Sequence, residues 1–363
     1  MAAAVASAAL LCPAATGAEV VAKEVGQSPD QIRGYWTAAR MQSAATVKLP
    51  QAFDPKLLTS SAAPARRSRR GLIRPTSGAV PIDFQAGSET GFPQRVHGRV
   101  FMTIPGLGDG SCSGTLVASR LQNVVVTAGH CAYALETAQW ASNFLFVPGY
   151  REGSAPFGEY PAAALLAPDE WTGAGEWSYD IAIAQLSTPL EAELGARGIA
   201  FNEAPRTNYQ IFGYPADPAP YDGELLIQCD APFFSLEYTG SHPFSTVAYP
   251  CNMQEGASGG GWVNPAGQVV SVSSHVYLDP GLDDLIVGPY FGSAAKRLYN
   301  RAGGSAKCPP AKQALTKAKR KARKVRKRVK RARSHRGERR ARKRLRRSRK
   351  RLRRARALHR EVC

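Results

Sequence analysis

Short β-rich runs recur between Val96 and Ala302, where apolar and β-branched residues are punctuated by Gly, Pro, Asn and Asp. Examples are VHGRVFMTI, NVVVTA, DIAIAQL, YQIFGY and GWVNPAGQVVSVSSHV. Many short strands separated by turn residues are typical of a barrel or a sandwich. We therefore expect residues 96–302 to form one all-β domain.

The chain before this domain has a different pattern. Residues 1–18 form a short apolar run that ends in small residues, which predicts a signal segment; the alternative is an Ala-rich buried helix. Residues 19–95 are predicted to be a pro-segment and linker, with one helix over 28–44. The basic run at 66–70 is either a cleavage site in an exposed linker or a solvated loop that is never cut.

The chain after this domain passes through a linker, 303–310, into a segment of almost only Arg, Lys, Ala, Leu and Val, 311–363. Small and apolar residues recur in that tail at spacings of four and three, in two runs of nearly equal length: Ala311, Leu315, Ala318, Ala322, Val325, Val329 and Ala332, then Ala341, Leu345, Ser348, Leu352, Ala355, His359 and Val362. The spacing predicts two helices. Folded back as an antiparallel hairpin, they would bring Cys308 beside Cys363, and a disulfide between these two cysteines is predicted to close the hairpin.

The charge of the protein is concentrated in this tail. From Lys307 to the end there are 29 Lys+Arg and 2 Asp+Glu, so 48 − 29 = 19 basic and 28 − 2 = 26 acidic residues remain elsewhere. The tail is therefore predicted to bind a polyanion, such as nucleic acid, an anionic polymer or acidic lipid. It has no aromatic residue to stack on bases, so base-specific recognition is not expected. The alternatives are a solubilising tail without a fixed partner, or a segment that stays disordered until a polyanion neutralises it.

The cysteine count indicates an exported protein. Of seven cysteines, Cys12 would leave with the signal segment, and six remain: Cys112, Cys131, Cys229, Cys251, Cys308 and Cys363. An even number in an exported chain predicts three disulfides. No later run is long and apolar enough to cross a bilayer. We expect a secreted, extracellular protein that the basic tail can hold at a cell surface.

Three local motifs carry candidate chemistry. In TAGHC, His130 follows a buried-strand pattern, and Cys131 beside it has Cys112 as its expected disulfide partner. In DIAIA, Asp180 heads an apolar strand, which suits a buried acceptor for an imidazole N–H. In GASGG, glycines on both sides expose Ser258.

Each motif by itself fits a structural residue, but the order His, Asp, Ser within one β-rich segment is far more specific. It supplies a nucleophile (Ser258), a general base (His130) and a residue that orients the base (Asp180). The backbone N–H groups of Gly256 and Ser258 would stabilise the oxyanion. No cofactor and no metal are needed for this reaction.

On TAGHC, DIAIAQL and GASGG, residues 96–300 resemble the trypsin/chymotrypsin-like serine peptidases, and in particular the secreted bacterial branch with glutamyl endopeptidases and actinobacterial trypsin-like enzymes. The resemblance implies two six-stranded antiparallel β-barrels with the catalytic cleft between them, and a protein or peptide substrate. His130 and Asp180 would come from the first barrel and Ser258 from the second. Cys251, seven residues before the nucleophile, would pair with Cys229.

Departures from the family pattern limit what the resemblance implies. Ala257 stands where animal enzymes have the Asp that pairs with a new N-terminus, so that route of activation is not expected. Asn252 stands at the base of the substrate pocket where trypsin has Asp, which does not support a preference for Arg or Lys. His275 is a pocket candidate because acid-preferring enzymes use a pocket histidine; the alternative is a surface strand residue.

The sequence therefore favours an active secreted serine endopeptidase. The alternative is an exported polyanion-binding protein whose protease-like domain is a catalytically idle scaffold. An esterase of the nucleophile-elbow type is disfavoured, because its serine precedes its histidine on an alternating strand–helix background.

Overall fold

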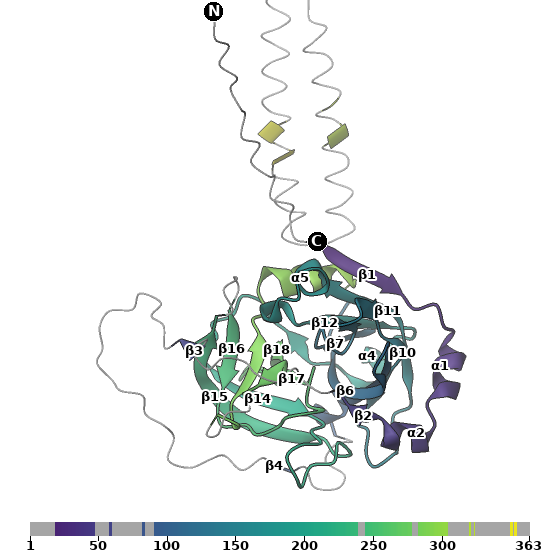
Figure 1. The fold of residues 1–363 in the computed structure, drawn as a ribbon. Coiled ribbons are helices and arrows are strands. Elements are labelled where there is room, and N and C mark those ends of the chain that lie inside the picture. Colours follow the sequence, from purple (N-terminus) through teal and green to yellow (C-terminus); the bar gives the residue numbers. More distant parts are fainter. Residues whose placement is uncertain are drawn as a thin grey trace, which may run out of the picture.

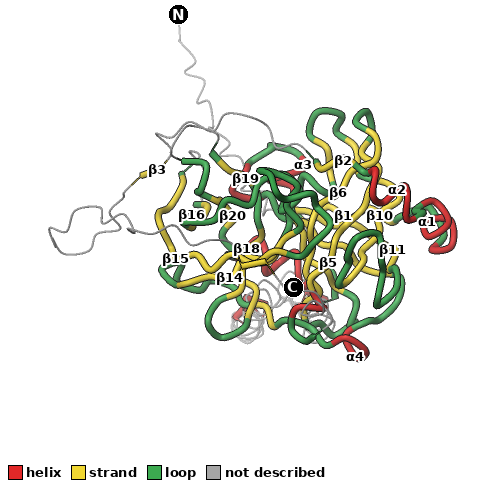
Figure 2. The backbone as a smooth tube through the Cα atoms, turned by 90° about the horizontal axis from the view of Figure 1, so that it is seen from below, coloured by secondary structure: helices red, strands yellow, loops and turns green. Residues whose placement is uncertain are grey.

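The computed structural model shows a body made mostly of β-strands, with a few short helices (Figures 1 and 2). The described residues are 19–47, 58–59, 82–83, 91–238, 244–277 and 282–303, with 319–320, 323, 349–350 and 352–353 of the tail. The predicted signal segment 1–18, nearly all of the linker 303–310 and most of the tail 311–363 lie outside them. So do Cys308 and Cys363, whose pairing stays a prediction.

Six antiparallel strands close into the first barrel. Their order is β5 (His97–Ile104), β6 (Gly108–Val117), β7 (Val124–Thr127), β12 (Ala182–Leu186), β11 (Tyr160–Pro168) and β10 (Ser142–Pro148). Because β10 also pairs with β5, the ring is complete. Its interior is filled by fully buried apolar side chains such as Val100, Leu116, Val125, Phe144 and Leu165. The prediction of a first six-stranded barrel is therefore confirmed.

The second sheet contains ten strands. Its main path runs through β13 (Gly198–Ile199), β18 (Gln268–Val272), β17 (Gly261–Val263), β14 (Asn208–Gly213), β15 (Ile227–Glu237), β16 (Ser245–Ala248), β20 (Ile286–Pro289) and β19 (His275–Val276). Only Ser273 and Ser274 separate β18 from β19 in the chain, so the two sides of the sheet are joined there. This arrangement is consistent with a second barrel and with the double-barrel fold that the sequence predicts.

The two sheets share a hydrophobic core. Phe101 and Val126 from the first barrel belong to the same buried cluster as Phe212 and Val269 from the second sheet. Polar contacts also cross between the sheets, because Ser113 in β6 donates its N–H to the carbonyl of Ser258 over 2.7 Å. The sheets are thus fixed against each other beside the residues of the GASGG motif.

Short elements complete the body. They are the hairpin β8 (Tyr133–Ala134) and β9 (Gln139–Trp140), the 3₁₀ turns η2 (Gln94–Val96) and η3 (Trp177–Tyr179), and the helices α3 (Asp169–Thr172), α4 (Glu191–Leu194) and α5 (Ser293–Arg301). The last of these packs near β11 and β12 of the first barrel. No helix in the described parts of the chain is long and apolar enough to cross a membrane.

The N-terminal segment packs along the first barrel (Figure 1). It contains β1 (Val20–Glu24), α1 (Pro29–Tyr35), α2 (Ala38–Ser43) and β2 (Ala45–Thr46). β1 adds an antiparallel strand to β11, and β2 pairs in parallel with β6. Between these strands the two helices and the turn that joins them bury Ile32, Trp36 and Met41. Residues 19–47 are therefore an integrated layer on the barrel, whatever their fate on maturation, which stays a prediction.

The single helix predicted over 28–44 is wrong in one respect, because the structure contains two short helices there. The first begins after Ser28, whose side chain forms a capping box with Gln31. The second begins after Thr37, whose hydroxyl accepts from the N–H of Arg40 and so caps a new helix start. Two short strands further along, β3 (Leu58–Thr59) and β4 (Ile82–Asp83), pair with β15.

Candidate active site

The ends of two neighbouring strands bring His130 and Asp180 together. β7 and β12 are antiparallel partners with Thr127 opposite Ala182, so the residues after β7 lie beside those before β12. Nδ1 of His130 is 2.8 Å from Oδ2 of Asp180, and the backbone N–H of His130 donates to Oδ1 over 2.8 Å. Asp180 is fully buried. One carboxylate therefore holds both the backbone and the ring of the histidine.

The glycine of the AGH motif is required by close packing around this pair. A Cβ at Gly129 would lie 2.8 Å from Oδ1 of Asp180 and 2.9 Å from the indole of Trp171. Trp177 packs against Trp171 with a 5.2 Å separation of ring centroids and lies 6.2 Å from the ring of His130. The indoles cover the carboxylate side of the histidine, which keeps water away from the hydrogen bonds.

A further hydroxyl reaches Asp180 from the second sheet. Ser274, between β18 and β19, donates its Oγ–H to Oδ2 of Asp180 over 2.6 Å. This bond joins the second sheet to the carboxylate supplied by the first barrel. Ser274 could not be selected from the sequence, because no motif surrounds it and its partner lies 94 residues away.

The loop that carries Ser258 makes a sharp turn before β17. Gly256 and Gly259 have φ values of +90° and +82°, which L side chains rarely adopt. Ser258 itself is 2% exposed. Its Oγ and Nε2 of His130 are both buried polar atoms without a hydrogen-bond partner among the described residues. Because buried polar atoms are normally paired, both atoms are available for bonding during a reaction.

Alternate backbone amides in this loop are used within the fold. The N–H of Ala257 donates to Gln254, and that of Gly259 donates to Ser273. In the described structure, the N–H groups of Gly256 and Ser258 donate to no protein carbonyl. The turn therefore leaves two amides unpaired on either side of Ala257, as an oxyanion-binding site requires.

Two disulfides support the loops around these groups. Cys112 in β6 is joined to Cys131, directly after His130, and Cys229 in β15 is joined to Cys251. Cys112, His130 and Cys131 also lie close enough together to resemble a metal-binding group. Both sulfurs are consumed by the disulfide, so the group offers no thiolate to a metal.

Comparison with known proteins gives the family of this domain. A family model described as a trypsin-like peptidase domain matches residues 112–272. The crystal structure of protease Anisep from Arthrobacter nicotinovorans is 34% identical, with a TM-score of 0.51, and the match covers 58% of this chain and 96% of that one. The structure of the thermostable serine protease AL20 from an extremophilic microorganism is 35% identical, with a TM-score of 0.52, over 58% of this chain and 97% of that one.

The chain belongs to the trypsin-like serine peptidase family. A further relative is a glutamyl endopeptidase of Bacillus licheniformis, 28% identical over 130 residues, which are 35% of this chain. The matched segment spans 38% of the length of that relative. The family resemblance drawn from TAGHC, DIAIAQL and GASGG is thus confirmed, and all three motifs lie within the matched residues 112–272.

The two pocket candidates of this peptidase domain differ in their surroundings. Asn252 is half-buried and accepts a hydrogen bond from the hydroxyl of Tyr221 over 3.3 Å. His275 is 1% exposed; its Nδ1 contacts the hydroxyl of Ser274 at 3.0 Å and its Nε2 contacts the carboxylate of Glu237 at 3.1 Å. A substrate side chain could bind the ring of His275 only by displacing one of these partners. The pocket roles of both residues stay predictions.

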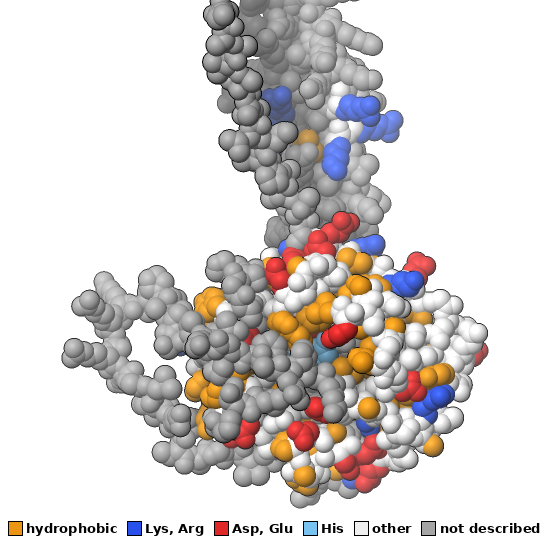
Figure 3. Space-filling model, in the orientation of Figure 1, with side chains coloured by type: hydrophobic (Ala, Val, Ile, Leu, Met, Phe, Trp, Pro, Cys, Tyr) orange, Lys and Arg blue, Asp and Glu red, His pale blue; other side chains and the backbone are white. Residues whose placement is uncertain are grey.

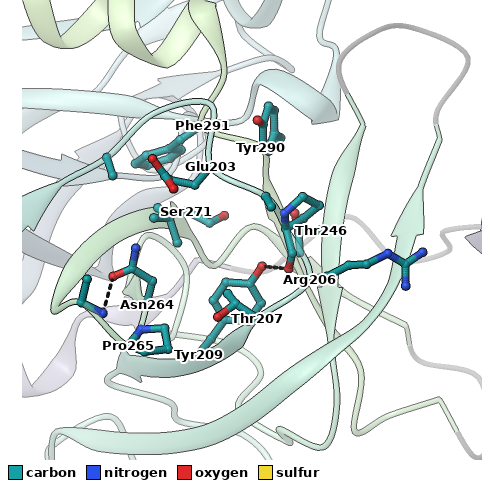
Figure 4. A pocket seen from close by; sticks show the side chains of 15 residues that line it. Glu203, Arg206, Thr207, Tyr209, Thr246, Asn264, Pro265, Ser271, Tyr290 and Phe291 are labelled. Atoms are coloured by element: carbon teal, nitrogen blue, oxygen red, sulfur yellow. Dashed lines mark hydrogen bonds between the residues drawn. The ribbon is translucent and has the colours of Figure 1, made fainter. Parts of the chain in front are cut away.

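A cavity lies over the second sheet, away from the residues of the catalytic motifs. It has a volume of about 350 Å³, and Figure 4 shows Glu203, Arg206, Tyr209, Asn264, Ser271 and Tyr290 among its lining residues. None of His130, Asp180 and Ser258 lines it. The cavity is therefore separate from the candidate active site.

The N-terminal segment borders the candidate site, which the sequence did not predict. Val47 lines a small pocket of about 40 Å³ together with His130, Trp171 and Trp177. Next to it, the hydroxyl of Thr46 donates to Oε2 of Glu255 over 3.1 Å. These contacts bring residues far from the motifs to the edge of the site, and no local pattern around them indicates it.

Proposed function

We propose that this protein is a serine endopeptidase that cleaves peptide bonds through Ser258 as nucleophile, His130 as general base and Asp180 as the orienting residue. The observation that carries the proposal is the buried Asp180 carboxylate, which binds both the backbone and Nδ1 of His130. With the Nδ1 proton donated to Asp180, Nε2 is the nitrogen left to accept a proton. Nε2 and the Ser258 hydroxyl are both buried and unpaired among the described residues, which supports their joint use.

The reaction then follows from these roles. Ser258 Oγ attacks the carbonyl carbon of the scissile bond while its proton passes to Nε2 of His130. The histidine gives this proton to the leaving amine as the C–N bond breaks, and an acyl-enzyme remains on Ser258. Water, deprotonated by His130, hydrolyses the ester and restores the serine. Asp180 keeps the imidazole in the required tautomer and stabilises the imidazolium in each half of the reaction.

The amides of Gly256 and Ser258 stabilise the negative oxygen that forms in both tetrahedral intermediates. Their lack of protein acceptors among the described residues supports this role. Removal of one such donor lowers kcat by about 10²- to 10³-fold in comparable sites. The fixed geometry of the loop means that no reorganisation is needed when charge develops.

The substrate is a protein or peptide, and the site of action is outside the cell. Two disulfides support an extracellular location, since disulfides persist in oxidising compartments. The family membership and the glutamyl endopeptidase relative support a peptide bond as the group attacked.

The basic tail acts as a tether to polyanions in this proposal. Six described residues of the tail are basic and exposed: Lys319, Arg320, Arg323, Arg349, Lys350 and Arg353. On the face of the body that Figure 3 shows, acidic side chains are scattered and few Lys and Arg side chains are seen. The tail and the body therefore differ in charge, and electrostatic binding would be confined to the tail.

A single substitution tests the catalytic assignment. Ser258→Ala is expected to abolish cleavage of a denatured protein substrate and of a peptide library while leaving the thermal unfolding transition in place. The matched control is Ser187→Ala, at an exposed serine outside the site, which is expected to retain full activity. Unchanged turnover in Ser258→Ala would refute Ser258 as the nucleophile. Absence of turnover in the folded wild-type chain would instead leave an idle, polyanion-binding scaffold as the function.

A further inference from the structure

A row of buried polar groups continues behind Asp180, away from His130. The hydroxyl of Ser274 lies 2.6 Å from Oδ2 of Asp180 and 3.0 Å from Nδ1 of His275. On the other side of the ring, Nε2 of His275 is 3.1 Å from both carboxylate oxygens of Glu237. The hydroxyl of Tyr277 donates to the same carboxylate. The catalytic carboxylate is thus linked through a serine and a histidine to a second carboxylate.

These groups are sealed inside the protein. Ser274, His275 and Tyr277 are at most 1% exposed, and Glu237 is fully buried at the end of β15. The ring of Trp177 packs edge-on against His275 with a 5.5 Å separation of ring centroids. Water is therefore a poor source of compensating hydrogen bonds, and the groups must satisfy one another.

Counting protons along the row fixes the state of His275. The hydroxyl of Ser274 has one proton, and the 2.6 Å contact with the acceptor Asp180 takes it. At the 3.0 Å contact, Ser274 is then the acceptor, so Nδ1 of His275 must donate. Nε2 is 3.1 Å from both carboxylate oxygens of Glu237, and an ionised carboxylate only accepts, so Nε2 donates as well. An imidazole that donates through both nitrogens is an imidazolium.

We propose that His275 is a buried imidazolium, paired with Glu237, which locks the hydroxyl of Ser274 onto Asp180 and thereby positions the catalytic carboxylate. The proposal rests on the function proposed above for Asp180 and His130. With Nδ1 of His275 donating into its lone pair, the Ser274 hydroxyl cannot rotate away from Asp180. Asp180 then keeps Oδ2 facing His130. His275 and Glu237 are positioning residues, because neither touches the reacting atoms.

The electrostatics of Glu237 agree with this pairing. Burial by itself would raise the pKa of this carboxyl, but the charge of His275 and the hydrogen bonds from His275 and Tyr277 outweigh burial and hold the pKa below its ordinary value. A lowered pKa agrees with an ionised Glu237 carboxylate that is paired with a charged His275 ring. An unpaired charge at a fully buried position would be strongly unfavourable, so Glu237 requires a cation beside it.

The protonation of His275 is measured by nuclear magnetic resonance on the full chain with ¹⁵N-labelled histidine, without any need for activity. The signals of His275 are identified as those that are missing from the spectrum of His275→Phe and displaced in that of Glu237→Gln. At neutral pH, we expect these signals to show a proton on each of the two ring nitrogens. In Glu237→Gln one of the two protons should be lost. A ring with a single N–H in the wild-type chain would overturn the proposal, even if Ser258 is confirmed as the nucleophile.

The positioning role is measured by a double-mutant cycle with Ser274. His275→Phe keeps a ring but no donor, and we expect kcat to fall by about 10- to 100-fold with KM changed less than about threefold. In the Ser274→Ala background, the same substitution should have no further effect on kcat. Independent effects that multiply in the double variant would overturn the relay.

The matched control is His97→Phe. His97 is equally buried, with Nδ1 2.9 Å from the hydroxyl of Thr115 and Nε2 3.2 Å from Arg197, but its contacts do not include Asp180. We expect this variant to lose stability and to keep its kcat. An equal loss of kcat in His97→Phe and His275→Phe would show that a buried histidine matters only for folding, and the positioning role would be refuted.

Discussion

Replacing Gly256 with alanine tests the proposed oxyanion site through a backbone position. Gly256 has a φ of +90°, which only glycine adopts without strain. An added Cβ would press into the carbonyl oxygen of Tyr214 and would lie 3.0 Å from Cγ2 of Thr46. The loop cannot easily move away, because Ser113 Oγ donates to the carbonyl of Gly256 and accepts from the N–H of Tyr214, each over 2.8 Å.

The magnitude follows from these contacts. A non-glycine residue at a positive φ costs about 1–3 kcal/mol, and overpacking against a backbone carbonyl costs a further 1–3 kcal/mol or so. The free energy of unfolding should therefore fall by about 2–6 kcal/mol. The displaced N–H of residue 256 no longer points at the oxyanion, so kcat should fall by about 10²- to 10³-fold.

The assay combines urea unfolding with steady-state kinetics on a peptide substrate. Gly34→Ala is the matched control: Gly34 lies in α1, and an added Cβ there has nothing within 4 Å. This control should be neutral or stabilise the protein by up to about 1 kcal/mol, with unchanged kcat. A Gly256→Ala enzyme that is folded and retains the wild-type kcat would refute the assignment of the amide.

Other features of the molecule allow further tests. Trp36→Ala removes a 2%-exposed indole whose Nε1–H donates to the carbonyl of Asn143 over 2.6 Å. Urea unfolding should therefore show that the free energy of unfolding falls by about 3–5 kcal/mol. A fall of less than about 1 kcal/mol would mean that residues 19–47 are dispensable for stability. Burial, together with Asp169, raises the pKa of Glu170 from 4.5 to about 7, so the folded state retains a proton there and stability falls as pH rises between these values. Glu170→Gln should remove this dependence of stability on pH, and its free energy of unfolding at pH 8 should exceed that of the wild type by about 1–2 kcal/mol, a figure reduced for the partial exposure of Glu170. Urea unfolding at several pH values measures both; an unchanged dependence on pH would contradict the raised pKa. Deletion of residues 311–363 should abolish binding to heparin or DNA, and binding by the intact chain should fall steeply between about 50 and 200 mM salt; salt-independent binding would contradict the electrostatic tether.

The sequence was sufficient to predict the first barrel and the contact between His130 and Asp180. The strand patterns around VVVT and AIAQL are short, apolar and bounded by turn residues, and the structure makes them β7 and β12. Because His130 lies three residues after β7 and Asp180 two residues before β12, antiparallel pairing of the two strands brings them together. The glycines of GASGG similarly indicate a sharp turn, which the positive φ of Gly256 confirms.

Contacts between distant, individually ordinary residues could not be predicted in this way. Ser274 reaches Asp180 only because β18 ends two residues before it at the junction of the two sides of the sheet, and Glu237 reaches His275 across the second sheet. Neither residue lies in a motif, and their roles depend on tertiary packing. The attachment of residues 19–47 to the barrel also depends on strand edges that hydrophobic periodicity does not reveal.

Covalent labelling with a fluorophosphonate probe decides whether the hydroxyl of Ser258 is activated by His130. The reagent reacts with a serine only when a neighbouring base takes up its proton. Mass spectrometry of the digested adduct should locate the phosphonyl group on Ser258 in the wild-type chain, and labelling should be lost in His130→Ala although that chain remains folded. Modification of a different residue, or equal labelling of the His130→Ala chain, would contradict a catalytic centre built from these two side chains.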